Sequence, residues 1–108
     1  MNQIKYTTSN GQVVAKGELG KEVLQAEGNF YFDKSAVNLE LLKREKEAYF
    51  CPIKSSSCDY FYLQNSQEIG GREIAWVYEK INNSLFGQLA GKIGFYAHSS
   101  TGLDLEKS

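Results

Sequence analysis

The sequence predicts a mainly β fold of small antiparallel sheets with one or two short helices. Short segments rich in β-branched and aromatic residues recur along the chain, and turn residues such as Asn10-Gly11 and Gly70-Gly71 separate them. Aromatic residues make up 13% of the chain, which favours sheets because flat rings fit a pleated surface. At 108 residues the chain is long enough for one domain with a core of its own.

Four strands are predicted in the first third of the chain. Residues 4–18 form a hairpin, because Asn10-Gly11 suits a tight primed turn with positive φ angles. Residues 21–28 ("KEVLQAEG") give a third strand. In residues 29–33 ("NFYFD") two rings alternate with other side chains, which indicates a half-buried strand. Its two sides carry Phe30 and Phe32, and Asn29 and Tyr31.

Two short helices are predicted. In residues 35–47 ("SAVNLELLKREKE"), Ser35 is a suitable N-cap and the composition favours helix. Val37 and Leu41 lie four residues apart and share a helix face, but the apolar pattern stops soon afterwards, so we expect only one or two turns. Residues 82–92 ("NNSLFGQLAGK") form the second helix, which begins at an Asn or Ser cap and ends at a glycine.

The second half of the chain contains the remaining strands. They are predicted at residues 47–51 ("EAYFC"), 59–64 ("DYFYLQ"), 73–79 ("EIAWVYE") and 92–98 ("KIGFYAH"). The third of these is the clearest, because Ile74, Trp76 and Tyr78 point to one side and Ala75 and Val77 point to the other. The polar residues 99–108 are predicted to form a flexible tail, so the domain itself spans residues 1–98.

The charge and hydropathy of the chain argue against some classes of partner. The formal net charge is −1, which gives no long-range attraction for nucleic acid. The densest charge run, "KREKE" at 43–47, alternates in sign and is typical of a solvated face. No apolar run approaches the ~20 residues that span a bilayer, and the first residues lack the apolar core of a secretory signal. We therefore expect a cytoplasmic monomer that binds neither nucleic acid nor membranes.

The cysteines and the histidine argue against a metal site, and we expect no cofactor. Structural zinc uses thiolates or imidazoles at short spacing, whereas Cys51 and Cys58 are seven residues apart and His98 is the only histidine. In the cytosol both cysteines are thiols, although a disulfide fits if the loop between them folds back. Lys54 could lower the pKa of Cys51. Without an obvious base partner, structural thiols are the favoured interpretation.

Six amphipathic rings in the predicted strands belong either to the core or to a ligand cleft. They are Tyr49, Tyr60, Tyr62, Trp76, Tyr78 and Tyr96. The segment "KSSS" at 54–57 lies among them in the sequence. It lacks the glycines that precede the lysine of a Walker phosphate loop, although a lysine beside hydroxyls can still bind one phosphate.

Four motifs in order carry a family resemblance. They are "NFYFD" (29–33), "CPIK" (51–54), "IAWVY" (74–78) and "GKIGFY" (91–96). In this combination, which extends over residues 11–97, the chain resembles the family called domain of unknown function 427, sometimes labelled nucleotidyltransferase-like. The resemblance implies a β-tent of antiparallel sheets similar to methionine sulfoxide reductase B. Relatives with that fold often hold zinc on Cys-x-x-Cys pairs, which this chain lacks.

The resemblance also implies which residues matter. The motif positions are Asn29, Tyr31, Phe32, Cys51, Pro52, Lys54, Trp76, Tyr78, Phe95 and Tyr96. Two departures affect the loops, because the family's proline after Tyr-Phe is Asp33 here and its glycine after the lysine is Ser55. A glycine at the second position would let the backbone approach a ligand closely.

We expect a pocket between "CPIK" and the strand that carries Trp76. Its candidate ligand-binding residues are Asn29, Tyr31, Cys51, Lys54, Trp76, Tyr78 and Tyr96. The expected partner is a small molecule, with a nucleotide-related one among the candidates, and the alternative is a non-catalytic module that binds a protein or peptide. No reaction is assigned, because nucleotidyl transfer needs metal-binding carboxylates. The acidic residues considered for that role, which form no recognisable pair in the sequence, are Asp33, Asp59, Glu73 and Glu79.

Overall fold

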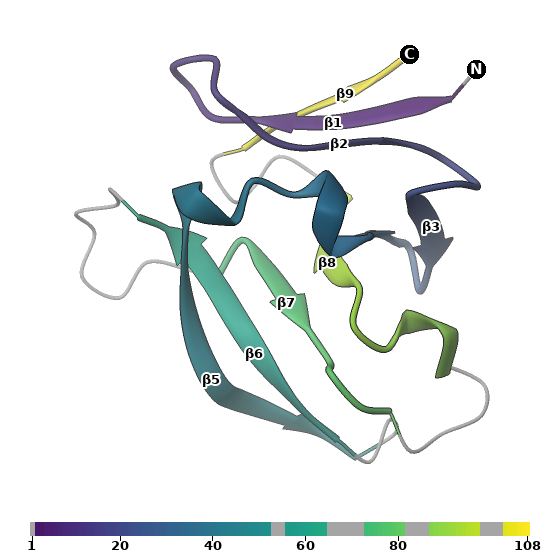
Figure 1. Cartoon of the computed structure of the whole chain (residues 1–108), viewed down its shortest axis with the longest axis vertical. Coiled ribbons are helices and arrows are strands. Elements are labelled where there is room, and N and C mark those ends of the chain that lie inside the picture. The colour runs from purple at the N-terminus through teal and green to yellow at the C-terminus, as the bar shows by residue number, and fades with distance from the viewer. Residues whose placement is uncertain (1, 53–55, 65–72, 82–86, 98–102) are drawn as a thin grey trace.

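The computed structural model describes residues 2–52, 56–64, 73–81, 87–97 and 103–108. Within these ranges the chain forms nine strands in two antiparallel sheets, with three isolated 3-10 turns (Figure 1). The predicted mainly β architecture of small antiparallel sheets is therefore confirmed. No helix in the described ranges is long and apolar enough to cross a membrane.

The smaller sheet has three strands. In spatial order they are β2 (Val13–Glu18), β1 (Gln3–Thr7) and β9 (Asp104–Lys107). The predicted hairpin of β1 and β2 is present, but its turn is not the tight primed type, because only Gly11 has a positive φ, at 88°. The Gly11 N–H donates to the Thr8 carbonyl at 3.0 Å, and the Thr8 N–H donates to the Gln12 carbonyl. The loop is thus longer than two residues and accommodates an irregularity of register at Thr7.

Strand β9 lies within the segment 99–108 that was expected to be a loose tail, and the expectation is wrong for residues 104–107, while residues 99–102 lie outside the described ranges. It pairs with β1 from Thr7↔Asp104 to Ile4↔Lys107, and Leu103 beside it is only 1% exposed. Gln3 and Ser108 exchange backbone hydrogen bonds of 2.8 and 2.9 Å, so the two ends of the chain lie side by side (Figure 1). Two leucines alternate with charged residues here, and this period of two supports a strand despite the polar composition.

The larger sheet has six strands. In spatial order they are β3 (Val23–Ala26), β4 (Asn29–Phe32), β8 (Ile93–Phe95), β7 (Ala75–Val77), β6 (Ser56–Leu63) and β5 (Leu42–Cys51). Strands β5 and β6 form a long hairpin that extends away from the smaller sheet (Figure 1). The charge run at 43–47 lies on β5, an edge strand, where charged side chains protect the edge from pairing with another chain.

The helix predicted at residues 35–47 is wrong. The chain instead makes two single turns, η1 (Lys34–Ala36) and η2 (Leu39–Leu41), and then enters β5. The lysine, arginine and glutamate residues of this segment favour a helix in isolation. Here they form a strand because the segment pairs with β6, and this pairing buries Leu42 opposite Leu63. Of the second predicted helix, residues 82–86 lie outside the described ranges, and the rest is the turn η3 (Gly87–Leu89).

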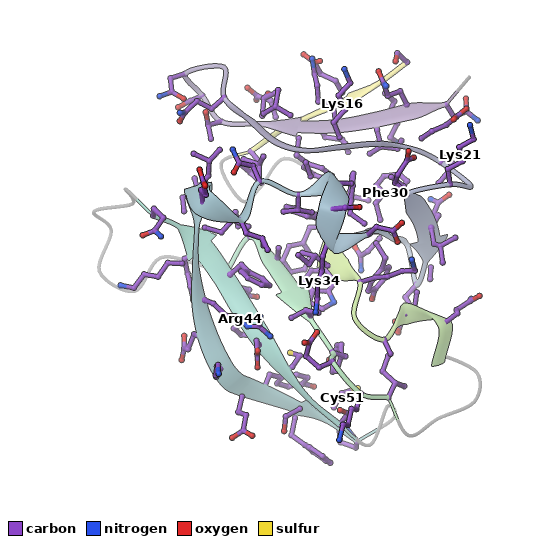
Figure 2. All side chains as sticks on the ribbon, viewed as in Figure 1. Lys16, Lys21, Phe30, Lys34, Arg44 and Cys51 are labelled. Atoms are coloured by element: carbon purple, nitrogen blue, oxygen red, sulfur yellow. The ribbon has the colours of Figure 1, made fainter. Side chains whose placement is uncertain are left out.

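The two faces of the larger sheet differ in what covers them. One face packs against the smaller sheet in a core that includes Tyr6, Phe30, Phe32, Val77 and Phe95. Figure 2 shows Phe30 between the two sheets. The opposite face carries a second cluster of Tyr31, Cys51, Cys58, Trp76, Tyr78 and Leu89. The alternation predicted for residues 29–33 is confirmed, since Phe30 and Phe32 face the smaller sheet whereas Tyr31 faces away from it. In residues 73–79 the prediction holds for Trp76 and Tyr78 but is wrong for Ile74, which lies in the core with Ala75 and Val77. Ile74 precedes β7 (Ala75–Val77), so the alternation of the strand does not extend to it.

Candidate functional site

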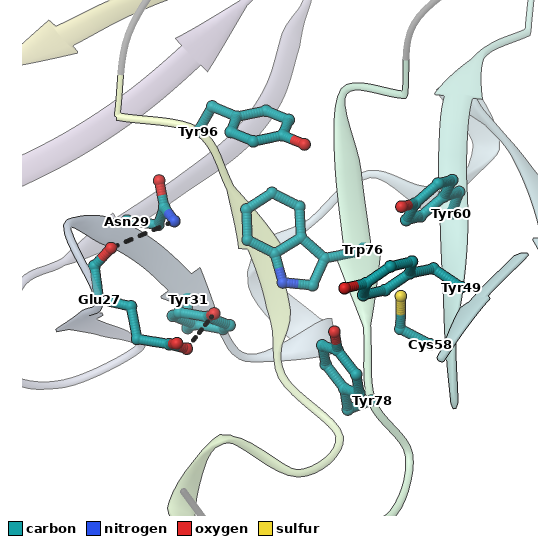
Figure 3. A pocket seen from close by; sticks show the side chains of 9 residues that line it. All are labelled: Glu27, Asn29, Tyr31, Tyr49, Cys58, Tyr60, Trp76, Tyr78 and Tyr96. Carbon is teal, nitrogen blue, oxygen red and sulfur yellow. Dashed lines mark hydrogen bonds between the residues drawn. The ribbon is translucent and has the colours of Figure 1, made fainter. Parts of the chain in front are cut away.

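A pocket of about 360 Å³ opens on the face of the larger sheet that is turned away from the smaller sheet. Six of its lining residues are aromatic and come from β4, β5, β6, β7 and the ends of β7 and β8. The described lining residues are Glu27, Asn29, Tyr31, Tyr49, Cys58, Tyr60, Trp76, Tyr78 and Tyr96 (Figure 3). Trp76 lies at the centre of this set in the figure.

The floor of the pocket depends on a glycine under the indole. Gly94 of β8 is paired with Tyr31 on one side and with Trp76 on the other. A Cβ atom at Gly94 would lie 2.6 Å from Cε2 of Trp76, so the indole covers the backbone at this point. Only a residue without a side chain allows Trp76 to lie this close to β8.

The rings around Trp76 stand at steep angles to it. Tyr31 meets the indole edge to face, with centroids 5.9 Å apart and planes at 85°. Tyr96 lies 4.7 Å from it and is tilted by 58°. Tyr49 and Tyr60 form a separate parallel pair across β5 and β6, with centroids 6.5 Å apart. The pocket is therefore a cup with walls at several angles.

Hydrogen bonds to the tyrosines hold the walls of the pocket in position. The hydroxyl of Tyr6, in the smaller sheet, donates to the carbonyl of Tyr96 at 2.6 Å. The Tyr96 hydroxyl in turn donates to Oε1 of Glu73 at 2.6 Å, and the Tyr31 hydroxyl donates to Oε1 of Glu27 at 3.3 Å (Figure 3). Two tyrosines of the pocket thus each donate to a carboxylate.

A tight turn brings Glu27 to the rim. It lies between β3 and β4, where Glu27 and Gly28 both have positive φ, of 55° and 77°. Two such residues between paired strands are typical of a primed two-residue turn. The primed turn that the sequence predicted at Asn10-Gly11 therefore occurs in the next hairpin instead. The Asn29 side chain beside it accepts from the Ala97 N–H at 3.4 Å.

The hydroxyls of Tyr31, Tyr60 and Tyr78 and the thiol of Cys58 are neutral at ordinary pH. Burial raises the pKa of Tyr31 to about 12, with a hydrogen bond from Trp76 opposing the shift and the Glu27 charge adding to it. Burial also raises the pKa values of Tyr60 and Tyr78. The pKa of the Cys58 thiol is raised by burial as well, although a hydrogen bond with Tyr78 acts in the opposite direction. The tyrosines can therefore donate and accept hydrogen bonds, while Cys58 is not a ready nucleophile.

The sequence-predicted residues fall into three groups. Those that line the pocket are Asn29, Tyr31, Trp76, Tyr78 and Tyr96. Cys51 is buried in the same cluster but is not among the described lining residues. Lys54 lies outside the described ranges, as does His98.

Four lining residues were absent from the predicted set. Cys58 and Tyr60 are two residues apart on β6 and therefore lie on the same face of the sheet. Tyr60 lies opposite Trp76, so the pairing of β6 with β7 places both residues at the pocket. Tyr49 lies opposite Cys58 and was among the rings expected in a core or cleft. Glu27 had no signal of its own in the sequence apart from the glycine that follows it.

Acidic residues and thiols in the described ranges form no metal site. No group of three or more His, Cys, Asp and Glu residues lies close enough together there to hold an ion. Both cysteines are buried free thiols. The acidic residues weighed for nucleotidyl transfer have other partners: Asp33 pairs with Lys92, Asp59 with Arg44, Glu79 with Lys34, and Glu73 with the Tyr96 hydroxyl. Figure 2 shows Lys34 and Arg44, which both contact Glu79.

Comparison with protein families gives one match. A family model described as a domain of unknown function (DUF427) matches residues 3–106, which is nearly the whole chain. It agrees with the resemblance seen in the four motifs and extends it to both ends. No curated protein matches the chain.

Proposed function

The chain belongs to the domain of unknown function 427 family, and on the geometry of its pocket we propose that it is a small-molecule-binding domain. The observation that carries the proposal is a cavity of about 360 Å³ surrounded by six aromatic side chains. Here the rings line a hollow that is open to the surface, whereas aromatic residues that serve only a core pack closely against one another. A cavity of this size falls in the range of small-molecule sites, which combine apolar walls with a few polar groups.

The proposed ligand makes two kinds of contact. Its apolar part packs against Trp76 and the rings next to it, since amphipathic aromatics offer a large rigid surface. Its polar part forms hydrogen bonds with the tyrosine hydroxyls, which burial keeps protonated. Asn29 adds an amide at the same end of the pocket as Tyr31 (Figure 3).

Binding of a nucleotide-related ligand would depend on Lys54. Phosphate groups need cationic or multiple N–H partners, and the described lining residues include no lysine or arginine. We propose binding and not nucleotidyl transfer, because the four acidic residues weighed for that reaction each interact with another side chain. We also propose that the protein is a cytoplasmic monomer that works without a cofactor.

A protein- or peptide-binding module is the second candidate. The observation in its favour is the pair of exposed neighbours on the edge strand β5, where Tyr49 is 47% and Phe50 is 57% exposed. An extended peptide could add to such an edge and use the rings as anchors. In this case Phe50 would contribute as much as Tyr49.

The two neighbours also provide the test. Tyr49 lines the pocket, whereas Phe50 follows it on β5 and is not among the described lining residues. A thermal-shift screen with nucleotides, sugars, amino acids and amines would first identify a compound that stabilises the protein. The proposal predicts that Tyr49→Ala weakens binding of that compound and that Phe50→Ala does not. Equal losses in both variants would favour the edge-strand candidate, and a screen without any stabilising compound would refute the pocket.

A further inference from the structure

The charges around the pocket are of one sign in the described residues. Of the nine lining residues, Glu27 is the only one that carries a formal charge, and it is a carboxylate. Glu73 adds a second carboxylate behind the wall, through its hydrogen bond with Tyr96. The described lining thus offers a carboxylate and no lysine or arginine, which favours a cationic ligand over an anionic one.

The aromatic rings add to this preference. The face of an aromatic ring is negative and attracts a cation within about 6 Å of the centroid, most strongly for tryptophan. Tyr31 and Tyr96 both donate their hydroxyl protons to carboxylates, and such a hydrogen bond polarises the phenol and makes its ring more electron-rich. The two rings nearest the indole are therefore the two whose faces are made more negative.

The angles between the rings favour a rounded group. A flat ligand stacks best in a slot with parallel walls, whereas Tyr31 and Tyr96 meet Trp76 at 85° and 58°. Walls at several angles present several ring faces to one compact group (Figure 3). An ammonium group substituted with alkyl groups has this shape and has weaker hydration than a bare ammonium ion.

We infer that the pocket binds a small molecule that carries a quaternary or tertiary ammonium group. The group is held by cation–π contacts with Trp76 and its flanking tyrosines and by the charge of Glu27. This inference rests on the proposed function and specifies the class of ligand for the same site. Aromatic recognition of such groups is worth most where the cation is withdrawn from water, which the depth of Trp76, at 8% exposed, allows.

The single tryptophan makes the inference directly measurable. Trp76 is the only tryptophan of the chain, so its fluorescence, excited at wavelengths where tyrosine does not absorb, reports on the pocket. The probes are choline and 3,3-dimethylbutan-1-ol, its neutral isostere, in which a carbon atom replaces the nitrogen. We expect choline to change Trp76 fluorescence and to bind about 10- to 30-fold more tightly than the neutral alcohol.

A matched pair of glutamate substitutions provides the second part of the experiment. Glu27 and Glu45 both accept a hydrogen bond from a tyrosine hydroxyl, but only Glu27 is among the described lining residues. Glu27→Gln should weaken choline binding by about 3- to 10-fold, as expected for a partly exposed charge. Glu45→Gln should leave it unchanged.

The outcomes separate this inference from the proposed function. Equal binding of choline and the neutral alcohol, or preferential binding of a nucleotide at the same residues, would overturn the ammonium inference and leave a small-molecule pocket. An unchanged affinity for choline in Glu27→Gln would also contradict it. If neither these probes nor any compound of the wider screen changes Trp76 fluorescence, the inference and the proposed function both fail.

Discussion

Substitution of Gly94 by alanine tests the packing that forms the pocket floor. The new Cβ would lie 2.6–2.8 Å from three atoms of the Trp76 indole, so the ring must move by about 1 Å to reach an ordinary contact distance. It is flanked by Tyr31 and Tyr96, which prevents it from moving alone.

The size of the effect follows from two opposing contributions. Forcing an extra methyl group into a packed site costs about 1–3 kcal/mol, and replacing glycine gains about 0.4–1 kcal/mol from the lower entropy of the unfolded chain. We therefore expect a net loss of about 1–2 kcal/mol in the free energy of unfolding, which is a fall of about 5–10 °C in Tm for a domain of this size.

Thermal unfolding followed by Trp76 fluorescence provides the assay. Gly94→Ala should lower the Tm and also change the emission of the folded state, because the indole moves. Gly87→Ala is the matched control, since a Cβ there meets no atom of the described residues within 4 Å. A Gly94→Ala protein with the Tm and emission of the parent would refute this account of the pocket floor.

Three further predictions concern the surroundings of the pocket. Burial raises the pKa of Asp59, but the Glu47 N–H and Arg44 outweigh it and lower the pKa overall. The contribution of Asp59 to stability is therefore complete above about pH 4 and is lost as the pH falls through its lowered folded-state pKa. Asp59→Asn should cost about 1–2 kcal/mol at pH 7 and progressively less as denaturant titrations are repeated below about pH 4; a constant difference would contradict this. Leu103→Ala should cost about 2–4 kcal/mol because the side chain is buried, and a parent-like midpoint would show that the segment is a loose tail after all. Cys58 should react slowly with a thiol reagent at pH 8 and quickly in denaturant; fast modification of the native protein would mean that the thiol is accessible and activated.

Local alternation in the sequence was enough to predict which strand faces form the site. Phe30 and Phe32 against Tyr31, and Trp76 against its neighbours, follow from the period of two along a strand, which depends on no distant residue. Five of the pocket's lining residues were predicted from the amphipathic rings together with the family resemblance, namely Asn29, Tyr31, Trp76, Tyr78 and Tyr96. The family resemblance added Cys51, which lies in the same buried cluster.

Strand pairing between distant segments accounts for what the sequence could not predict. Residues 42–47 have the composition of a helix, and they form a strand because β6 lies beside them. Residues 104–107 are polar, and they are ordered by pairing with β1 at the other end of the chain. Glu27 reaches the pocket because β4 turns back on β3, a consequence of backbone conformation at two residues.

Mapping of amide chemical shifts on the native protein is the most direct test of the central claim that this pocket is a ligand site. The protein would be titrated with the compounds of the screen, choline included. The account predicts shifts that cluster at Tyr31, Tyr60, Trp76, Tyr78 and Tyr96, with the residues of the smaller sheet unchanged. Shifts confined to the outer edge of β5, or no shifts with any compound, would contradict it.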